Sequence, residues 1–189
     1  SLNEADNIAF VTKQLARGLM EYFPNFTAMI INLDNNSKDG TREAFLSADT
    51  GNIPKKYIST DAFMVGKGNN MRNLFLEVVQ HRAKAVIVVD ADLKSITPEW
   101  VKILATPILE GHDYITPLYS RNEYDGTITN HITYPLIYSL FKANIRQPIG
   151  GDFSFSPRMA INWLDMEWEE STRQYGIDIF MTTSALLNG

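Results

Sequence analysis

The most constraining feature of this sequence is a short apolar run, Val86-Ile87-Val88-Val89, that stops at two carboxylates, Asp90 and Asp92. A run without alternation is typical of a strand buried on both faces, as in a parallel sheet covered by helices. Ligands of such sheets bind beyond the carboxyl ends of the strands. Two carboxylates at that place suit Mg²⁺ or Mn²⁺, whose coordination phosphate oxygens usually complete. A helix cap and a solvated turn are the commoner explanation of a lone Asp-x-Asp, so the pair needs companions.

Helix-like and strand-like segments alternate along the rest of the chain. Besides 86–89, the patterns predict strands at 27–33, 56–59 and 114–118. Helices are expected after a cap at Asn3 up to about residue 22, at 42–48, 70–82 and 130–143, and after Pro98, Ser156 and Gly176. This alternation predicts an α/β fold with a mostly parallel central sheet and helices on both faces, a Rossmann-like arrangement.

Composition narrows the class of protein. With 189 residues, 44% of them hydrophobic, one globular domain is expected. The net charge of −5 argues against a nucleic acid partner, which usually demands a basic face. The absence of cysteine excludes disulfides, a thiolate nucleophile and cysteine-based zinc sites. No apolar stretch is long enough for a membrane span and no signal peptide opens the chain, so a cytoplasmic location is expected.

Two further segments place polar groups where a phosphate ligand could bind. Asp34 ends the first predicted strand, as Asp90 ends the central one, so both belong to one sheet edge if the strands are parallel. Lys67, flanked by Gly66 and Gly68, precedes a helix whose N–H groups and dipole favour phosphate. A local Asx turn at Asp34 and an ordinary Gly-Lys-Gly turn remain the structural alternatives.

Taken together, these segments resemble the nucleotide-diphospho-sugar domain of family-2-like glycosyltransferases. The resemblance covers nearly the whole chain. Two later segments resemble, more narrowly, the retaining mannosylglycerate synthases and glucosyl-3-phosphoglycerate synthases. The segments that carry both likenesses are Leu2-Asn3-Glu4, Asp34 to Thr41, Gly66-Lys67-Gly68-Asn69, Asp90 to Trp100, Gln147 to Asp152, and Tyr175-Gly176-Ile177-Asp178.

The resemblance implies a role for each residue at the nucleotide end of the donor. Leu2 and Glu4 would line the nucleobase pocket, and Asp34 or Asn35 would lie near the base or the ribose. Lys67 would reach the base or the diphosphate. The donor would be a GDP- or UDP-hexose.

At the sugar end, the resemblance implies that Asp92 is the direct ligand of Mg²⁺ or Mn²⁺ and that Asp90 holds the ribose or the donor sugar. Asp178 would contact that sugar and could steady positive charge in the transition state; as structure alone, it is a carboxylate favoured by a helix dipole. The catalytic set is therefore Asp90, Asp92 and Asp178. The residues that would shape the sugar pocket are Gly150, Gly151 and Asp152.

The loop from Arg121 to Thr129 matches the acceptor site of the resembled enzymes. There Arg121, Asp125 and Thr129 would bind a small carboxylate such as glycerate, and an arginine fork suits that task. The alternative, that Arg121 is a surface arginine without a partner, carries equal weight. Thr127 stands where the phosphoglycerate enzymes have arginine, so an acceptor without phosphate is expected.

The sequence thus predicts a metal-dependent hexosyltransferase that moves mannose or glucose to a small hydroxy acid with retention. An inverting family-2 enzyme acting on a lipid or polysaccharide, a nucleotidyltransferase and a catalytically silent sugar-nucleotide binder are the alternatives. Residues 1–189 are expected to be one catalytic domain without its usual first strand and without a C-terminal part that carries a further histidine ligand. A homodimer is among the oligomeric states left open.

Overall fold

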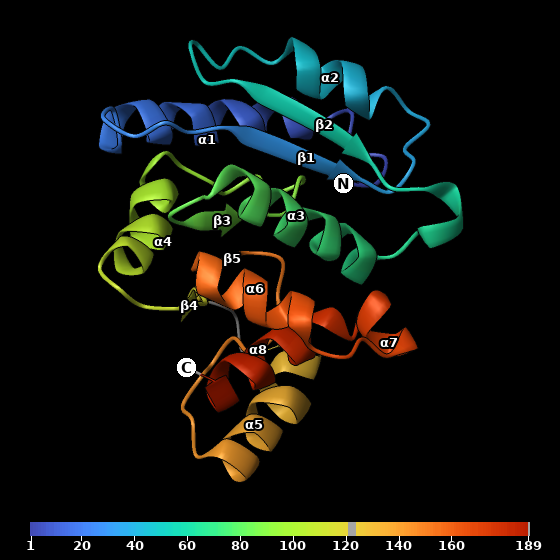
Figure 1. Ribbon diagram of the computed structural model, residues 1–189, viewed down its shortest axis with the longest axis vertical. Helices are drawn as coiled ribbons and strands as arrows, with labels where there is room; N and C mark the ends of the chain where they lie inside the picture. Colours follow the sequence, from blue (N-terminus) through green and yellow to red (C-terminus); the bar gives the residue numbers. More distant parts are fainter. Residues whose placement is uncertain (121–123, 189) are drawn as a thin grey trace.

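The computed structural model describes residues 1–120 and 124–188 and has an α/β fold (Figure 1). A parallel pair of strands, β1 and β2, lies beside three strands in the order β3-β5-β4. β5 runs antiparallel to both of its neighbours, while the arrows of β1, β2 and β3 point the same way in Figure 1. The strand bounds are β1 Ile30–Asp34, β2 Lys55–Ser59, β3 Val86–Val88, β4 Tyr114–Ile115 and β5 Phe153–Phe155.

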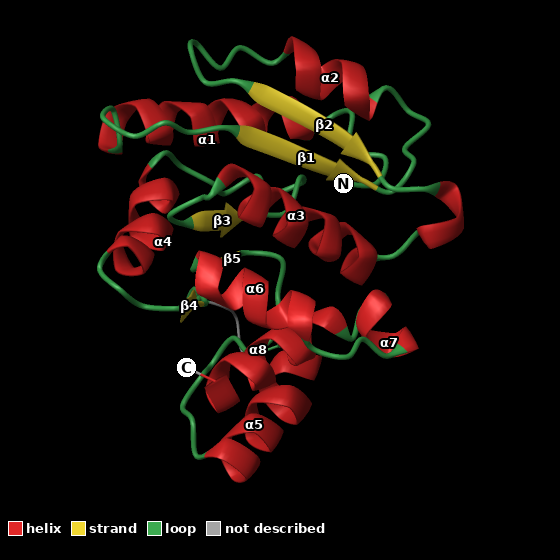
Figure 2. Cartoon of the chain, in the orientation of Figure 1, coloured by secondary structure: helices red, strands yellow, loops and turns green. Residues whose placement is uncertain are grey.

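Helices separate the strands along the chain, as the alternation predicted (Figure 2). α1 packs against α4, and α3 packs against α6. A turn of 3₁₀ helix, η1, precedes α3, and a π-helical stretch, η2, leads directly into α5. The bounds are α1 Ile8–Tyr22, α2 Thr41–Ser47, η1 Ala62–Met64, α3 Lys67–His81, α4 Glu99–Leu109, η2 Thr129–Thr133, α5 Tyr134–Phe141, α6 Pro157–Asp165, α7 Glu170–Arg173 and α8 Ile177–Asn188.

Strand β1 shows why helices cover both faces of the sheet. Its successive side chains point to opposite faces, and both faces are apolar. Ile30 packs in a core with residues of α1 and α2, whereas Ile31 and Leu33 pack in a second core with α3, α6 and α8. Aromatic rings fill that second core, where the Phe75 and Trp163 ring centroids lie 4.9 Å apart. The predicted α/β fold with helices on both faces is therefore confirmed.

Four details differ from the expectation. The central strand ends at Val88, so Asp90 and Asp92 follow it in a turn and do not share a strand face. The ladder stops because the Asp90 N–H donates to a side chain, Oδ1 of Asp152, at 3.0 Å. β5 was not predicted, and β4 is shorter than the predicted strand 114–118. Asn3 caps no helix; its N–H donates to Ser37 Oγ at 2.8 Å.

Candidate active site

The first residues of the chain are tied to the loop that follows β1. The Glu4 N–H donates to Thr41 Oγ1 at 2.8 Å, and the Lys38 N–H donates to Asn3 Oδ1 at 3.0 Å. These bonds hold Leu2 and Glu4 beside the carboxyl end of β1. Leu2 is half exposed, so its side chain remains available to a flat ring such as a nucleobase. The Glu4 carboxylate accepts a hydrogen bond from Asn7 Nδ2 at 2.9 Å.

Asp34, at the end of β1, is fully buried and holds its own loop. Its carboxylate accepts from the Ser37 N–H at 2.8 Å, from Ser37 Oγ at 2.6 Å and from Ser1 Oγ at 2.8 Å. Burial acts to raise the pKa of Asp34, but the hydrogen bonds from Ser37, Ser1 and Tyr57 outweigh it and lower that pKa. The local turn expected as the structural alternative is present, and contact with base or ribose stays a prediction.

Asn35 links this loop to the glycine-lysine turn, because its Oδ1 accepts from the Gly66 N–H at 3.3 Å. The segment that precedes α8 packs against this glycine-lysine turn. The Gly68 N–H donates to the Gln174 carbonyl at 3.1 Å. A Cβ at Gly68 would lie 1.9 Å from the carbonyl oxygen of Thr172, so only glycine permits this approach.

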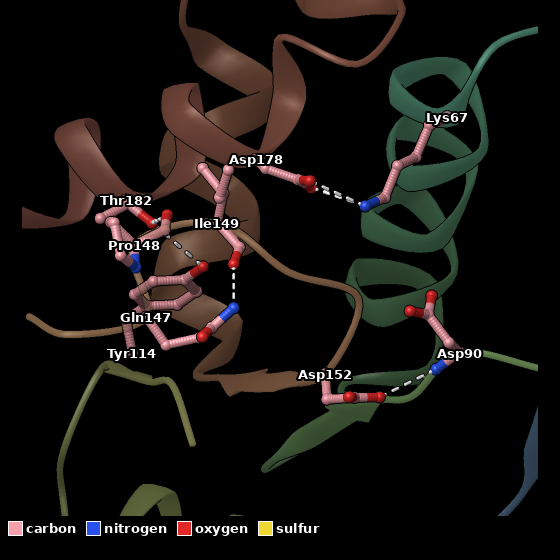
Figure 3. A network of polar contacts seen from close by, with 9 residues as sticks. All are labelled: Lys67, Asp90, Tyr114, Gln147, Pro148, Ile149, Asp152, Asp178 and Thr182. Atoms are coloured by element: carbon pink, nitrogen blue, oxygen red, sulfur yellow. Dashed lines mark hydrogen bonds and ion pairs between the residues drawn. The ribbon is translucent and has the colours of Figure 1, made fainter. Parts of the chain in front are cut away.

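The docked segment brings Asp178, in the first turn of α8, to Lys67 at the start of α3. Lys67 Nζ lies 2.8 Å from both carboxylate oxygens of Asp178 (Figure 3). Burial raises the pKa of Asp178, and the ammonium of Lys67 only partly offsets that rise. Among the described residues, Oδ1 of Asp178 is buried and accepts no hydrogen bond beyond its ion pair with Lys67. Apart from that ion pair, the lone pairs of this oxygen are therefore unused in the described part of the chain.

Asp90 and Asp152 form the other side of the same cluster (Figure 3). While Oδ1 of Asp152 accepts the Asp90 N–H, its Oδ2 accepts from the hydroxyl of Tyr119. The Asp90 residue is exposed, but its carboxyl group is crowded: a Cβ at Gly151 would lie 1.9 Å from its Oδ2. Desolvation and then the charge of Asp152 raise the pKa of Asp90 to about 6, against the opposing effect of Lys67.

A hydrogen bond from α8 positions the Gly150-Gly151 turn. Thr182 Oγ1 donates to the Pro148 carbonyl at 2.6 Å, and the Gln147 amide donates to the Ile149 carbonyl (Figure 3). One helix thus positions both Asp178 and the turn that faces Asp90. The structure gathers Lys67, Asp178, Asp90, Gly151 and Asp152 at one place. Their proposed roles in binding and chemistry remain predictions.

The other sequence-predicted residues have different positions. Asp92 is exposed and lines a cavity of about 310 Å³ with Asn7 and Phe10. Asp125 is exposed and Thr129 is buried, while Arg121 lies outside the described residues. Among residues 1–120 and 124–188, no group of three or more carboxylate or histidine side chains is arranged to hold a metal ion.

Sequence reasoning missed one residue of this cluster, Tyr119, which bonds the Asp152 carboxylate. A single tyrosine after an expected strand carries no pattern of its own. Only the order of strands reveals its role, because β4 pairs with β5 and β5 begins directly after Asp152. The ring of Trp100 lies 6.1 Å from that of Tyr119, centroid to centroid, and supports it.

The Lys67 ammonium lies beside crowded carboxylates and a glycine turn. This arrangement suits a ligand with both phosphate and hydroxyl groups. The comparison with protein families decides its class: the glycosyl transferase family 2 model matches residues 1–164. This chain belongs to that family. Its α/β fold is the one found in solved glycosyltransferase structures.

Solved structures agree on the fold. A mycobacterial protein matches with a TM-score of 0.76 at 23% identity, over 100% of this chain and 59% of its own. Glucosyl-3-phosphoglycerate synthase of Mycobacterium tuberculosis, in complex with phosphoglyceric acid, matches with a TM-score of 0.73 at 21% identity, over 97% and 62%. Mannosyl-3-phosphoglycerate synthase of Rubrobacter xylanophilus matches with a TM-score of 0.67 at 24% identity, over 84% and 52%.

No curated protein matches the chain significantly. The chain spans about three fifths of the length of the first two solved structures and about half of the third. Within the described part of the chain, none of the helices combines the length and the apolar character needed to cross a bilayer.

Proposed function

We propose that this family-2 glycosyltransferase transfers a hexose, mannose or glucose, from a nucleotide-diphosphate sugar to a small hydroxy acid such as glycerate, with retention. The observation that carries the proposal is the Lys67–Asp178 pair, which faces Asp90 and the Gly151-Asp152 turn. A structure of the similar glucosyl-3-phosphoglycerate synthase contains Mn²⁺, uridine diphosphate and phosphoglyceric acid. That content supports a donor and an acceptor of these chemical classes here.

The residues present fit a divalent cation that the donor itself helps to bind. Asp90 and Asp92 follow β3, and the neighbouring carboxylates of Asp152, Asp92 and Asp178 all contribute to the raised pKa of Asp90. Excess negative charge of this kind attracts a cation. Mg²⁺ and Mn²⁺ sites in such enzymes commonly use one or two carboxylates and complete their coordination with phosphate oxygens. Asp92, exposed beside the cluster, is the proposed ligand.

Negative charge on the departing nucleotide diphosphate dominates the barrier to sugar transfer. The bond from the anomeric carbon to the diphosphate oxygen breaks, and a bond from that carbon to the acceptor oxygen forms. The acceptor proton passes to the leaving diphosphate. The Lys67 ammonium stabilises the charge on the leaving group, since it lies at the start of α3 beside donor N–H groups. A bound cation would add Lewis-acid stabilisation of the same charge.

Asp178 and the glycine turn are proposed to hold the sugar. Asp178 is proposed to accept a sugar hydroxyl at Oδ1, which pairs only with Lys67 among the described residues. The transition state has oxocarbenium character that a nearby carboxylate stabilises. Gly151 lets the Asp90 carboxylate pack directly against the backbone of the turn, which places that carboxylate beside the proposed sugar position. For the acceptor, Arg121, Asp125 and Thr129 remain the proposed residues, and Arg121 would pair with the carboxylate of glycerate.

The test is a panel of GDP- and UDP-hexoses offered with glycerate, lactate or phosphoglycerate, in the presence of Mn²⁺ or of a chelator. NMR of the product identifies the anomer. Retained anomeric configuration on glycerate, lost with chelator, supports the proposal. An inverted anomer would contradict retention. Transfer only to phosphoglycerate would contradict the proposed acceptor. Calorimetric binding of the donor without any turnover would instead identify a silent sugar-nucleotide binder.

A further inference from the structure

Two buried polar side chains, Thr60 and Asn70, lie where the ends of β1 and β2 meet the start of α3. The arrowheads of both strands point to the side of the molecule where α3 begins (Figure 1). Thr60, directly after β2, is 2% exposed, and Asn70, in the first turn of α3, is 4% exposed. Burying a polar group is costly unless it is hydrogen-bonded, and asparagine is a weak helix former. Both side chains are therefore expected to make hydrogen bonds that the fold or the site needs.

Thr60 joins the loop after β1 to α3. Its backbone holds the loop, because its N–H donates to the Asp34 carbonyl at 2.8 Å and its carbonyl accepts from Asn36 Nδ2 at 2.7 Å. Its hydroxyl holds the helix, because Oγ1 donates to Asn70 Oδ1 and accepts from Asn73 Nδ2 at 3.3 Å. One residue thus bonds to both elements, and only its side chain reaches the helix.

Asn70 completes the connection from the helix side. While its Oδ1 accepts the Thr60 hydroxyl, its Nδ2 donates to the Leu33 carbonyl, near the end of β1, at 3.5 Å. Lys67 begins the same helical turn, three residues earlier. The bonds of Asn70 therefore fix the turn that carries the Lys67 ammonium against the end of β1.

We propose that Thr60 and Asn70 are positioning residues, whose bond sets the distance between the loop that contacts the nucleoside and the Lys67 ammonium that contacts the diphosphate. The inference rests on the proposed function, which assigns both contacts to one donor. A ligand that spans two subsites binds best when they are held at the right separation. Another bond, from the Gly66 N–H to Asn35 Oδ1, also joins loop and helix, but at 3.3 Å it is long. The Thr60–Asn70 bond is buried, where hydrogen bonds are stronger than in water.

Binding measurements with Mg²⁺ present test this, by calorimetry for UDP and GDP and by NMR titration for uridine and guanosine. Thr60→Val keeps the shape of the side chain and removes its hydroxyl. It should weaken binding of whichever nucleoside diphosphate the wild type binds by at least about tenfold. The affinity for the nucleoside should stay the same, because the backbone bonds of residue 60 to the loop remain. Thr60→Ser, which restores the hydroxyl, should bind the diphosphate like the wild type.

Thr50→Val is the matched control. Thr50 is also buried, at 6% exposed, but its hydroxyl donates to the Ile53 carbonyl within its own turn, at 2.8 Å. Both valine variants should unfold at lower urea concentrations than the wild type, but only Thr60→Val should lose diphosphate affinity. Asn70→Ala breaks the same bond from its other end. It should lose as much affinity, and the double variant should lose no more than either single variant.

The possible outcomes separate this inference from the proposed function. Diphosphate affinities of Thr60→Val and Asn70→Ala that equal the wild-type value overturn the positioning role and leave the proposed function standing. An equal loss of nucleoside affinity overturns it too, because the loop itself would then be distorted, and so do additive losses in the double variant. A wild type that binds neither UDP nor GDP overturns the proposed function and this inference with it. Far-ultraviolet circular dichroism verifies folding, and if Thr60→Val does not fold, the two affinities of Asn70→Ala decide.

Discussion

Lys67 Nζ lies 2.8 Å from the carboxylate of Asp178, although 111 residues separate the two in the chain. Two glycines make this contact possible. Gly68 lets the backbone at Thr172 approach the first turn of α3. Just before α8 begins, a Cβ at Gly176 would lie 2.6 Å from the Ser171 carbonyl oxygen. The start of one helix therefore meets the start of another. The positive charge of Lys67 is held where a diphosphate would need it.

The first prediction concerns that ammonium group. Lys67→Ala should lower kcat/KM for the donor by about 10²–10³, because a preorganised charge on the leaving group is lost. Initial rates over a range of donor concentrations measure this. Lys56→Ala is the matched control, since Lys56 pairs with Glu77 at 2.6 Å on the surface and such pairs contribute little to stability. Equal kinetics for the two variants would remove Lys67 from the mechanism.

The second prediction concerns the turn opposite Asp90. In Gly151→Ala the added Cβ would lie 1.9 Å from Asp90 Oδ2, so the Asp90 side chain must turn away. We expect donor affinity, measured by calorimetry with Mn²⁺ present, to fall at least about tenfold, with the melting temperature little changed. At the neighbouring Gly150, a Cβ would meet only the Gln147 amide, at 3.1 Å. Gly150→Ala should thus have a smaller effect, and the reverse order would show that Asp90 does not contact the donor.

Much of this architecture follows from local patterns. The apolar run before Asp90 and the alternation of segments predict the α/β fold, because both depend on side-chain spacing within one element. The glycine-bearing segments gave the family correctly as well. The start of α3 was predicted three residues late, at Asn70, because glycine is a poor helix former and Gly68 lies inside the first turn.

Relations between elements could not be predicted from local patterns. That Asp152 accepts the Asp90 N–H depends on β5 lying between β3 and β4, and β5 is only three residues long. The need for glycine at Gly68 comes from a carbonyl at Thr172, about a hundred residues away. The contribution of Tyr119 has the same origin. Such contacts are set by tertiary packing, and a single sequence carries no local record of them.

The third prediction is a pH dependence of stability that arises from Asp34. Its pKa is lowered in the folded state, so the ionised carboxylate stabilises the fold at pH values above the unfolded pKa of about 3.9. This contribution is lost as the pH falls through the lower, folded pKa. In urea titrations at neutral pH, Asp34→Asn should be less stable than the wild type, by about 1–3 kcal/mol for its buried hydrogen bonds.

The gap between Asp34→Asn and the wild type should narrow as the pH falls from about 5 to 2, since only the wild type loses a carboxylate there. Asp125→Asn, at an exposed position, controls for the loss of one negative charge. Free-energy curves for Asp34→Asn and the wild type that stay parallel over this range would show that the ionisation of Asp34 is not coupled to folding.

The last prediction separates the docking of residues 172–174 from general stability. In Gly68→Ala, the added Cβ would meet a backbone oxygen, that of Thr172, so either that segment or the start of α3 must move. The free energy of unfolding should fall by about 1–3 kcal/mol, as for other overpacked sites.

Gly18→Ala is the matched control, because its Cβ would lie 2.4 Å from another backbone oxygen, that of Pro98. Both variants should lose stability in urea titrations, but only Gly68→Ala should also lower kcat/KM of the folded enzyme, because it parts Lys67 from Asp178. If Gly18→Ala reduces turnover as strongly, the loss reflects general destabilisation, and the close approach at Gly68 has no special connection to the chemistry.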